Sequence, residues 1–195
     1  SKLGAIDKDL YCTTDCSSYI ECPGYFGHLN LNKPVFHEGY IDFILLILRC
    51  IDHTDSRLIL NPYSRRIKNV LKLKNPRQRL GIISKLCTYA CGLSRLKKFK
   101  ESPHEDFIDS KISLQPRYSR DGWCIIAKFD EKLTSEPIRV LTAERVYEIL
   151  KNMSDIDCKI IGLNPKLSRP DWMILTVLPI PPPTVRPSVM FDVNT

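Results

Sequence analysis

The sequence predicts an α+β fold, in which a small antiparallel sheet and several helices are combined with zinc-knuckle-like loops. Three observations predict it. Cysteines are spaced as in metal knuckles near the start, short runs of β-forming residues alternate with helix-capping patterns, and seven of the fourteen prolines lie between residues 165 and 187. A chain of 195 residues is expected to form one domain or two small ones, with a sizeable core.

The first third of the chain is predicted to begin as loop. Glycine and proline interrupt every periodic pattern in residues 1–39, so only short extended pieces are expected there. Residues 40–50 predict a mostly buried helix, with a buried strand as the alternative, because short apolar runs are ambiguous. A short strand is expected over residues 57–60.

The middle of the chain predicts two helices. Ser64 can cap a basic helix that ends near Leu73, and a second helix is expected to begin after Pro76. This second helix is expected to run to about Ala90, with Gly92 as its stop signal. Residues 93–112 are polar and charged and are expected to form a mobile loop.

The last third predicts a return to mixed structure. Residues 123–129 are rich in β-formers and predict a strand. Thr142 is placed as the N-cap of a helix over residues 143–153. The proline run at 179–183 must be extended, because each proline fixes φ and lacks a donor. Two further strands are expected, over residues 159–163 and 172–178.

The positive charge is concentrated in one block. The net charge is +7, and residues 64–100 contain twelve Lys or Arg and no Asp or Glu. Such a block usually faces a polyanion or an acidic partner. A solvated basic helix face is the alternative, because charge runs alone are weak evidence.

The cysteines indicate reduced thiols and metal ligation rather than disulfides. Three of the eight, Cys12, Cys16 and Cys22, fall within eleven residues, and the first residues have no apolar segment of the signal-peptide type. The chain has no initiator Met, which allows a start in mid-protein. The longest apolar run, residues 43–48, is too short to cross a bilayer, so no membrane is expected as a partner.

Two segments resemble the start of the largest subunit of eukaryotic RNA polymerase. One is ECPGYFGH at 21–28, followed by LNKPVFHEG at 31–39, and the other is SRPDWMILTVLPIPPPTVRPSV at 168–189. Residues 4–7 and 141–150 match at corresponding places, whereas residues 61–120 match weakly. The short motifs CPG, VFH and PPP are more similar to polymerase II than to polymerase I or III.

This resemblance implies a clamp region with a core over residues 1–60, a variable head over 61–120 and a return of the core over 121–195. Its implied partners are DNA, the RNA–DNA hybrid and other polymerase subunits, especially the second-largest, in the nucleus. The whole enzyme would be a DNA-directed RNA polymerase that uses Mg²⁺. The family's Asp-rich metal loop does not occur in this sequence, so no catalytic residue is expected and the chain alone should be inactive.

The resemblance also implies a zinc site near the start. The four ligand positions of that site correspond to Cys12, Asp15, Cys22 and Tyr25 of this chain. Asp15 replaces a Cys of the family and Tyr25 replaces its His. A shifted set is the main prediction, with one Zn²⁺ at most, while a metal-free loop and the family's own set with Asp15 and Tyr25 are the alternatives. The shifted set comprises Cys12, Cys16, Cys22 and His28.

The family's second zinc site is expected to be lost. Its slots fall on two carboxylates, one thiol and an ammonium, namely Asp52, Asp55, Cys87 and Lys111. Another set of four residues has the number and type of ligands that a zinc site needs. The favoured interpretation is that its thiols pack in the core and its histidine lies on the surface. That set would be Cys50, His53, Cys87 and Cys91.

Basic side chains are the predicted nucleic-acid contacts, because they would meet phosphates without reading bases. Arg186 is added because it follows a rigid proline run. The predicted contacts are Arg65, Arg66, Lys68, Lys72, Lys74, Arg77, Arg79 and Arg186.

Two other functions remain open at this point. One is a stand-alone zinc-ribbon interaction or nucleic-acid-binding protein, which would explain the cysteines and the basic block but not the proline-dense end. The other is the same clamp region in polymerase I, polymerase III or a viral enzyme.

Overall fold

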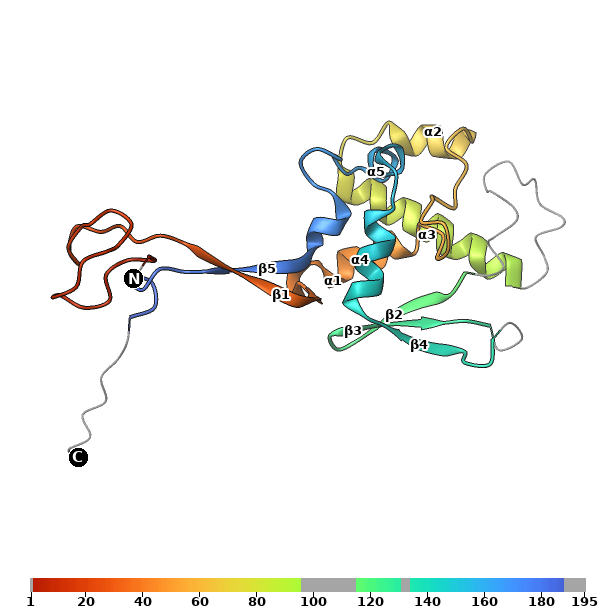
Figure 1. The fold of residues 1–195 in the computed structure, drawn as a ribbon. Helices are drawn as coiled ribbons and strands as arrows, with labels where there is room; N and C mark the ends of the chain where they lie inside the picture. The colour runs from red at the N-terminus through yellow and green to blue at the C-terminus, as the bar shows by residue number, and fades with distance from the viewer. Residues whose placement is uncertain (1, 96–114, 131–133, 188–195) are drawn as a thin grey trace, which may run out of the picture. The chain divides into compact units, whose positions relative to one another are not determined.

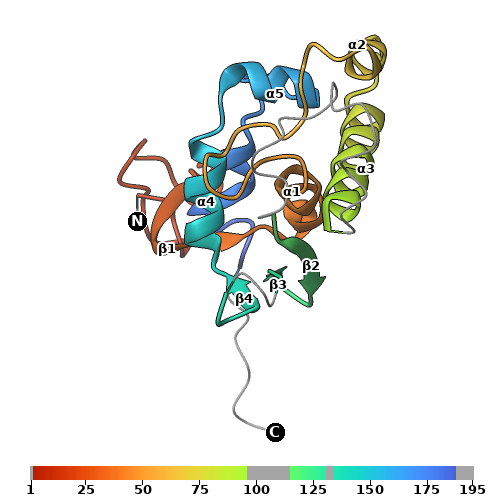
Figure 2. The same cartoon turned by 90° about the vertical axis from the view of Figure 1, so that its right-hand side faces the viewer.

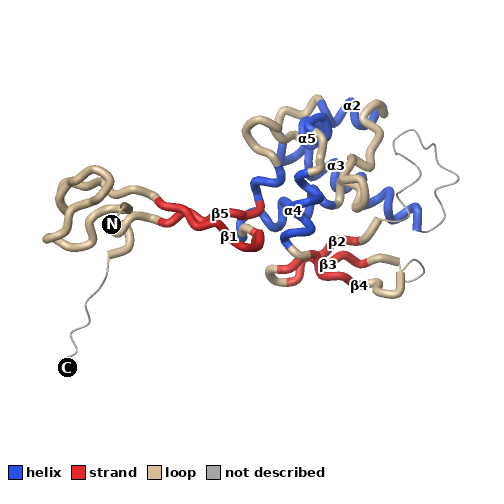
Figure 3. Tube along the Cα trace, viewed as in Figure 1, coloured by secondary structure: helices blue, strands red, loops and turns tan. Residues whose placement is uncertain are grey.

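A computed structural model describes residues 2–95, 115–130 and 134–187 (Figure 1). The chain divides into two compact units, which are described separately. The small unit comprises residues 1–32 and 176–195, and the large unit comprises residues 33–175. Both helices and small sheets are present, so the predicted α+β class is confirmed (Figure 3).

The described residues contain five strands and five α-helices, with short 3₁₀ turns between them. The strands are β1 (Gly27–Phe36), β2 (Arg117–Asp121), β3 (Cys124–Lys128), β4 (Ile138–Leu141) and β5 (Ile174–Ile180). The helices are α1 (Ile41–Leu48), α2 (Arg65–Leu71), α3 (Pro76–Arg95), α4 (Ala143–Lys151) and α5 (Asp155–Ile161), with 3₁₀ turns η1 (Glu38–Tyr40) and η5 (Pro170–Met173).

Side-chain caps begin three of the helices. The hydroxyls of Ser64, Thr142 and Ser154 each accept a hydrogen bond from a backbone amide in the first turn of α2, α4 and α5, respectively. The predicted starts of α2 and α4 are therefore confirmed. The apolar run at 40–50 is also confirmed as a helix, because α1 buries five of its eight residues.

Two predictions about helices were wrong. Residues 159–163 were expected to form a strand, but α5 covers most of them, because Ser154 caps a helix that ends at Gly162 with φ 105°. Helix α3 was expected to stop at Gly92, but it continues to Arg95. The predicted loop over 93–112 lies mostly outside the described residues.

Two of the strand predictions were confirmed. Strand β3 lies within the predicted 123–129, and β5 overlaps the predicted 172–178. The strand predicted over residues 57–60 was not confirmed, because these residues form isolated bridges, at Leu58, which pairs with Ile51, and at Leu60. Strand β1 is longer than the short extended pieces expected before residue 39.

The large unit is built on a three-stranded antiparallel sheet in the order β2-β3-β4. Tyr118, Ile125, Ala127 and Leu141 are buried on this sheet. Helix α1 lies between β2 and α3 and contacts both (Figure 2). It carries fully buried isoleucines into the core. Helix α4 adds Val146, Ile149 and Leu150 to the same core.

Strands β1 and β5 form a separate two-stranded sheet. They bring together a segment near the start of the chain and a segment near its end. None of the helices within residues 2–95, 115–130 and 134–187 combines the length and the apolar character needed to cross a membrane.

Candidate functional site

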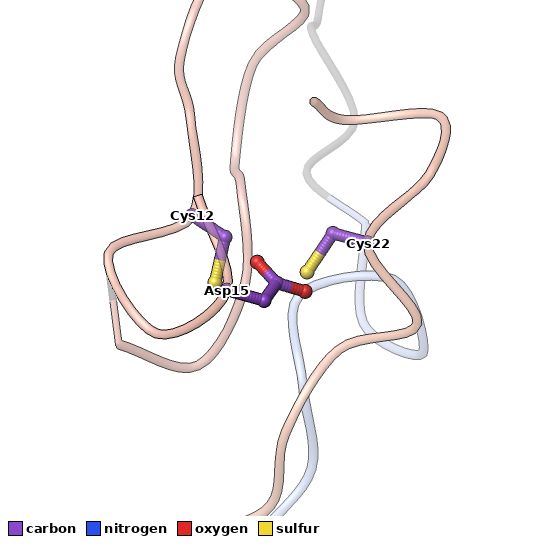
Figure 4. A group of neighbouring side chains, drawn as sticks. All are labelled: Cys12, Asp15 and Cys22. Carbon is purple, nitrogen blue, oxygen red and sulfur yellow. The ribbon is translucent and has the colours of Figure 1, made fainter. Parts of the chain in front are cut away.

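The opening loop of the small unit gathers three groups that can ligate a metal ion. The thiols of Cys12 and Cys22 and the carboxylate of Asp15 all lie within 4.8 Å of one another (Figure 4). Both cysteines are buried and Asp15 is half-buried. Within the described ranges, no other place gathers three Cys, His, Asp or Glu ligand atoms so closely. We call these three residues the thiol–carboxylate group.

Tight turns bring the thiol–carboxylate group together. The amide of Cys16 donates to the carbonyl of Cys12 at 2.9 Å, and the amide of Cys12 donates to the carbonyl of Ser17 at 3.0 Å. Cys16 closes this turn with φ 57°, a left-handed conformation that costs a residue other than glycine roughly 1–2 kcal/mol. A second turn, in which the amide of Cys22 donates to the carbonyl of Ser18 at 3.0 Å, presents the other thiol.

Asp15 is the acceptor at the centre of the group. Its Oδ1 accepts a hydrogen bond from the amide of Ser17 at 3.1 Å, and its Oδ2 accepts one from the hydroxyl of Tyr25 at 3.0 Å. The bond from Ser17, with further hydrogen bonds from Cys12, Cys22 and Tyr25, lowers the pKa of Asp15 to about 2. The carboxylate is therefore ionised at neutral pH, which is the form that attracts a cation.

The thiol and phenol of this site are held in their protonated forms. Burial raises the pKa of Cys22, and the hydrogen bond to Asp15 raises the pKa of Tyr25. A thiol of this kind gives up its proton when a soft cation binds, so metal binding would release protons. The group can thus act as a hydrogen-bonded cluster around Asp15 or as a set of metal ligands.

The group supplies three of the four donors that a closed structural zinc site needs. Two thiolates and a carboxylate are donors that Zn²⁺ accepts, and the ligand atoms of a tetrahedral zinc site lie roughly 3.8 Å apart. Separations within 4.8 Å require only a small contraction to reach that geometry. An ion held by Cys12, Asp15 and Cys22 would pin the loop, and it would supply no reaction.

The predicted shifted set is brought together only in part. Cys12 and Cys22 belong to the group, but Cys16 is exposed beside it and His28 is exposed on β1. Neither of these two joins the gathered ligand atoms. The set with Cys16 and His28 remains a prediction, and the observed geometry favours Asp15 over Cys16 as a ligand.

The closing prolines pack against the same loop of the small unit. Gly24 has φ +80°, and a Cβ at this position would lie only 2.6 Å from the Cβ of Pro182. At Gly4, a Cβ would lie 3.6 Å from Cδ of Pro183 and 3.9 Å from Sγ of Cys22. The motifs at the two ends of the sequence therefore meet around one of the ligand thiols.

The predicted nucleic-acid residues lie mainly on α2 and the start of α3 in the large unit. Arg66 is placed on α2. In this part of the chain the exposed side chains among the predicted residues are those of Arg65, Lys68, Lys72, Lys74 and Arg77. No acidic residue occurs between positions 64 and 100 of the sequence, so positive charge is concentrated in this segment. We call these five residues the basic surface.

Arg79 and Arg186 differ from the basic surface. Arg79 is half-buried, and it donates to the carbonyl of Leu73 and, at 3.4 Å, to the carbonyl of Lys159. It therefore ties the chain before α3 to α5. Arg186 is exposed, and its Nε donates to the carbonyl of Pro181 at 3.0 Å, which keeps the guanidinium on the proline turn.

The residues at the second implied zinc position do not fit a metal ion. The Cys87 thiol is fully buried, burial raises its pKa well above the usual range, and it donates to the carbonyl of Cys50 at 3.9 Å. The thiol of Cys50 donates to Leu46, and His53 pairs with Tyr118. Asp52, Asp55 and Cys91 do not join them in a metal-ligating group among the described residues, and Lys111 lies outside those residues.

One relation in the site was missed by sequence reasoning. Asp15 and Tyr25 were treated as two separate losses of a zinc ligand, yet the hydroxyl of Tyr25 donates to Asp15 at 3.0 Å. The sequence could have indicated this contact, because one changed ligand position carries a hydrogen-bond acceptor, Asp15, and the other carries a donor, Tyr25. Such a complementary pair of changes predicts that the two side chains meet.

The fold and the site define an α+β chain in which two thiols and a carboxylate lie close together on tight turns. A family model described as RNA polymerase Rpb1, domain 1, matches residues 1–195, so the chain belongs to this family. It is also 33% identical over 199 residues to the DNA-directed RNA polymerase II subunit RPB1 of Euplotoides octocarinatus. That similarity covers 99% of this chain and 40% of the relative's length.

Proposed function

We propose that this chain is the amino-terminal clamp segment of the largest subunit of a DNA-directed RNA polymerase II, and that it acts in DNA-templated transcription in the nucleus. The observation that carries the proposal is the match of the family over the whole of residues 1–195. The relative from Euplotoides octocarinatus, named as a polymerase II subunit, supports polymerase II rather than polymerase I or III.

In this proposal the chain holds nucleic acid and does not catalyse. Residues 1–60 and 121–195 form the clamp core, and residues 61–120 form the head. The basic surface contacts phosphates of DNA and of the RNA–DNA hybrid, and other subunits, above all the second-largest, complete the enzyme. Bond formation at Mg²⁺ takes place elsewhere in that complex, because the Asp-rich metal loop is absent from this sequence.

The basic surface supports this role through its charge and exposure. Among its exposed residues, Lys68 lies on α2, Lys72 and Lys74 lie in the connection between the two helices, and Arg77 lies at the start of α3. Lysine and arginine that meet phosphates release counterions from the nucleic acid, which drives binding without regard to sequence. The binding should therefore be sensitive to salt and indifferent to base sequence.

Removing four charges from the basic surface is expected to weaken nucleic-acid binding at least about tenfold at low salt. The variant changes Lys68, Lys72, Lys74 and Arg77 to Gln, and fluorescence anisotropy with a labelled RNA–DNA hybrid and a random duplex measures the affinity. Each lost phosphate contact should also reduce the slope of log K against log salt by about 0.9 for a duplex.

A matched control removes four positive charges elsewhere in the chain. Lys8, Lys33, Lys128 and Lys166 are exposed, and changing all four to Gln alters the net charge equally. The control should bind almost as the wild type does. Equal loss of binding in both variants, or a strong preference of the wild type for one base sequence, would contradict a phosphate-binding clamp surface.

A structural zinc ion held by the thiol–carboxylate group is the second part of the proposal. We expect the purified chain to contain one zinc ion, measured by mass spectrometry of the metal, and we expect Asp15→Ala and Cys22→Ala to lose it. Cys16→Ala should keep it, as should the control Cys124→Ala, which removes an exposed thiol from β3.

The outcomes separate the three interpretations of this loop. Loss of zinc in Cys16→Ala, with retention in Asp15→Ala, would establish the shifted set with His28. A wild-type chain free of zinc would exclude both ligand sets and would leave the hydrogen-bonded cluster around Asp15 as the structure of the loop.

A further inference from the structure

The turn that follows α1 in the large unit contains a buried carboxylate. Asp52 is 6% exposed, and its Oδ2 accepts hydrogen bonds from the hydroxyl of Thr54 at 3.0 Å and from the amide of Asp55 at 3.3 Å. The amide of Asp52 donates to the carbonyl of Arg57 at 2.7 Å, and its carbonyl accepts from Ser56 at 3.1 Å. The turn is thus folded around Asp52.

The other oxygen of this carboxylate reaches a distant part of the chain. The side-chain amide of Gln115 donates to Oδ1 of Asp52, across 63 positions in sequence. Gln115 is itself 3% exposed. A buried carboxylate without donors would be very unfavourable, so each of these donors contributes to holding the turn in place.

Further bonds join the same two segments. His53 Nδ1 lies 3.0 Å from the hydroxyl of Tyr118, and Arg49 donates to the carbonyl of Tyr118 at 3.1 Å. Asp42 on α1 accepts from Arg120 on β2 at 2.8 Å. These bonds run from α1 and its following turn to the first strand of the sheet.

These hydrogen bonds surround Asp52, one of the positions where the family resemblance implies ligands of a second zinc ion. The nearby thiols of Cys50 and Cys87 donate hydrogen bonds to backbone carbonyls, and the carboxylate of Asp52 is already surrounded by donors from protein. Neither the thiols nor the carboxylate is arranged as a ligand set. The residues present therefore hold the segment together in a different way.

We propose that a buried carboxylate–amide lock between Asp52 and Gln115, and not a metal ion, fastens the turn after α1 to the start of the three-stranded sheet. The lock performs the mechanical task that a structural zinc ion would perform, because it joins two segments that are far apart in sequence. It requires no cation and no thiolate. Metal dependence, if present, is then confined to the small unit.

Exchanging the roles of the two side chains tests the lock. Gln115→Glu places a second carboxylate against Asp52, and it is expected to lower the thermal midpoint of the large unit by about 6 °C or more. The double variant Asp52→Asn with Gln115→Glu restores one carboxylate and one amide, and it should recover at least half of that loss. Tryptophan fluorescence is a suitable signal, because both tryptophans, Trp123 and Trp172, lie in the large unit.

A chelator provides the second measurement. A Cys22→Ser chain lacks one thiol of the thiol–carboxylate group. In this chain EDTA should leave the thermal midpoint, measured by tryptophan fluorescence, unchanged. A lowered transition in EDTA would overturn the proposal, since it would show a metal ion in the large unit. Unchanged stability in Gln115→Glu, or no recovery in the double variant, would overturn it equally.

Discussion

Gly24→Ala is expected to disrupt the small unit while the large unit remains folded. Gly24 has φ +80°, and an added Cβ would lie 2.6 Å from the Cβ of Pro182, which belongs to the rigid closing segment. The left-handed conformation costs alanine roughly 1–2 kcal/mol, and overpacking adds roughly 1–3 kcal/mol. Together these costs are comparable with the few kcal/mol that stabilise a small unit of this kind.

Hydrogen exchange separates local from global unfolding in this variant. Amides of the opening loop should exchange much faster in Gly24→Ala, whereas the fluorescence transition of Trp123 and Trp172 should be unchanged. Gly122→Ala is the matched control. Gly122 also has a positive φ, of 56°, but nothing lies within 4 Å of its added Cβ, so only the conformational cost applies.

Exchange in Gly24→Ala at the wild-type rate would refute the packing of the closing prolines on the opening loop. Exchange that is equally fast in Gly122→Ala and Gly24→Ala throughout the chain would show a general effect of alanine at positive φ. The two glycines differ mainly in the space around them, so their comparison isolates the contact with Pro182.

Helices with a complete local signal could be predicted from the sequence. Ser64 and Thr142 combine a capping hydroxyl with apolar residues at helical spacing, and both caps are present in the structure. The same signal was present at Ser154, where Asp157 follows three residues later and its amide bonds the Ser154 hydroxyl. The β-branched residues Ile160 and Ile161 suggested a strand. A helix forms instead, because Ser154 caps its start and Gly162 ends it in a left-handed conformation.

Strands were predictable only where they are apolar. Strand β2 has the sequence RYSRD and was not predicted, because four of its five residues are polar or charged. A turn signal was available, since Asp121-Gly122 precedes β3 and Gly122 has φ 56°. Strand β1 gives no such signal, because its partner β5 begins more than a hundred residues later.

The candidate site shows a comparable limit. The region of the candidate metal site was evident from Cys12 and Cys22, but it was not evident that Asp15 rather than Cys16 lies beside their thiols. Neighbouring residues on a tight turn point in different directions, and the left-handed φ of Cys16 turns that residue out to solvent. Only the backbone conformation distinguishes the two, and spacing alone carries no information about it.

Ile149→Ala is expected to destabilise the large unit by roughly 2–5 kcal/mol, which is the usual cost of truncating a buried isoleucine. Ile149 is 2% exposed on α4 and belongs to the core that α1 and the sheet share. A domain has a total stability of about 5–15 kcal/mol, so this one change removes a large part of it. We expect the thermal midpoint of the tryptophan transition to fall by about 6–15 °C.

Ile156→Ala supplies the control, because it is the same substitution seven positions later and Ile156 is 70% exposed. Its effect should stay within about 0.5 kcal/mol, as for most surface changes. Equal destabilisation by the two changes would mean that α4 does not bury its apolar face in the isolated chain. The difference between the two isoleucines thus measures how far this segment folds by its own core.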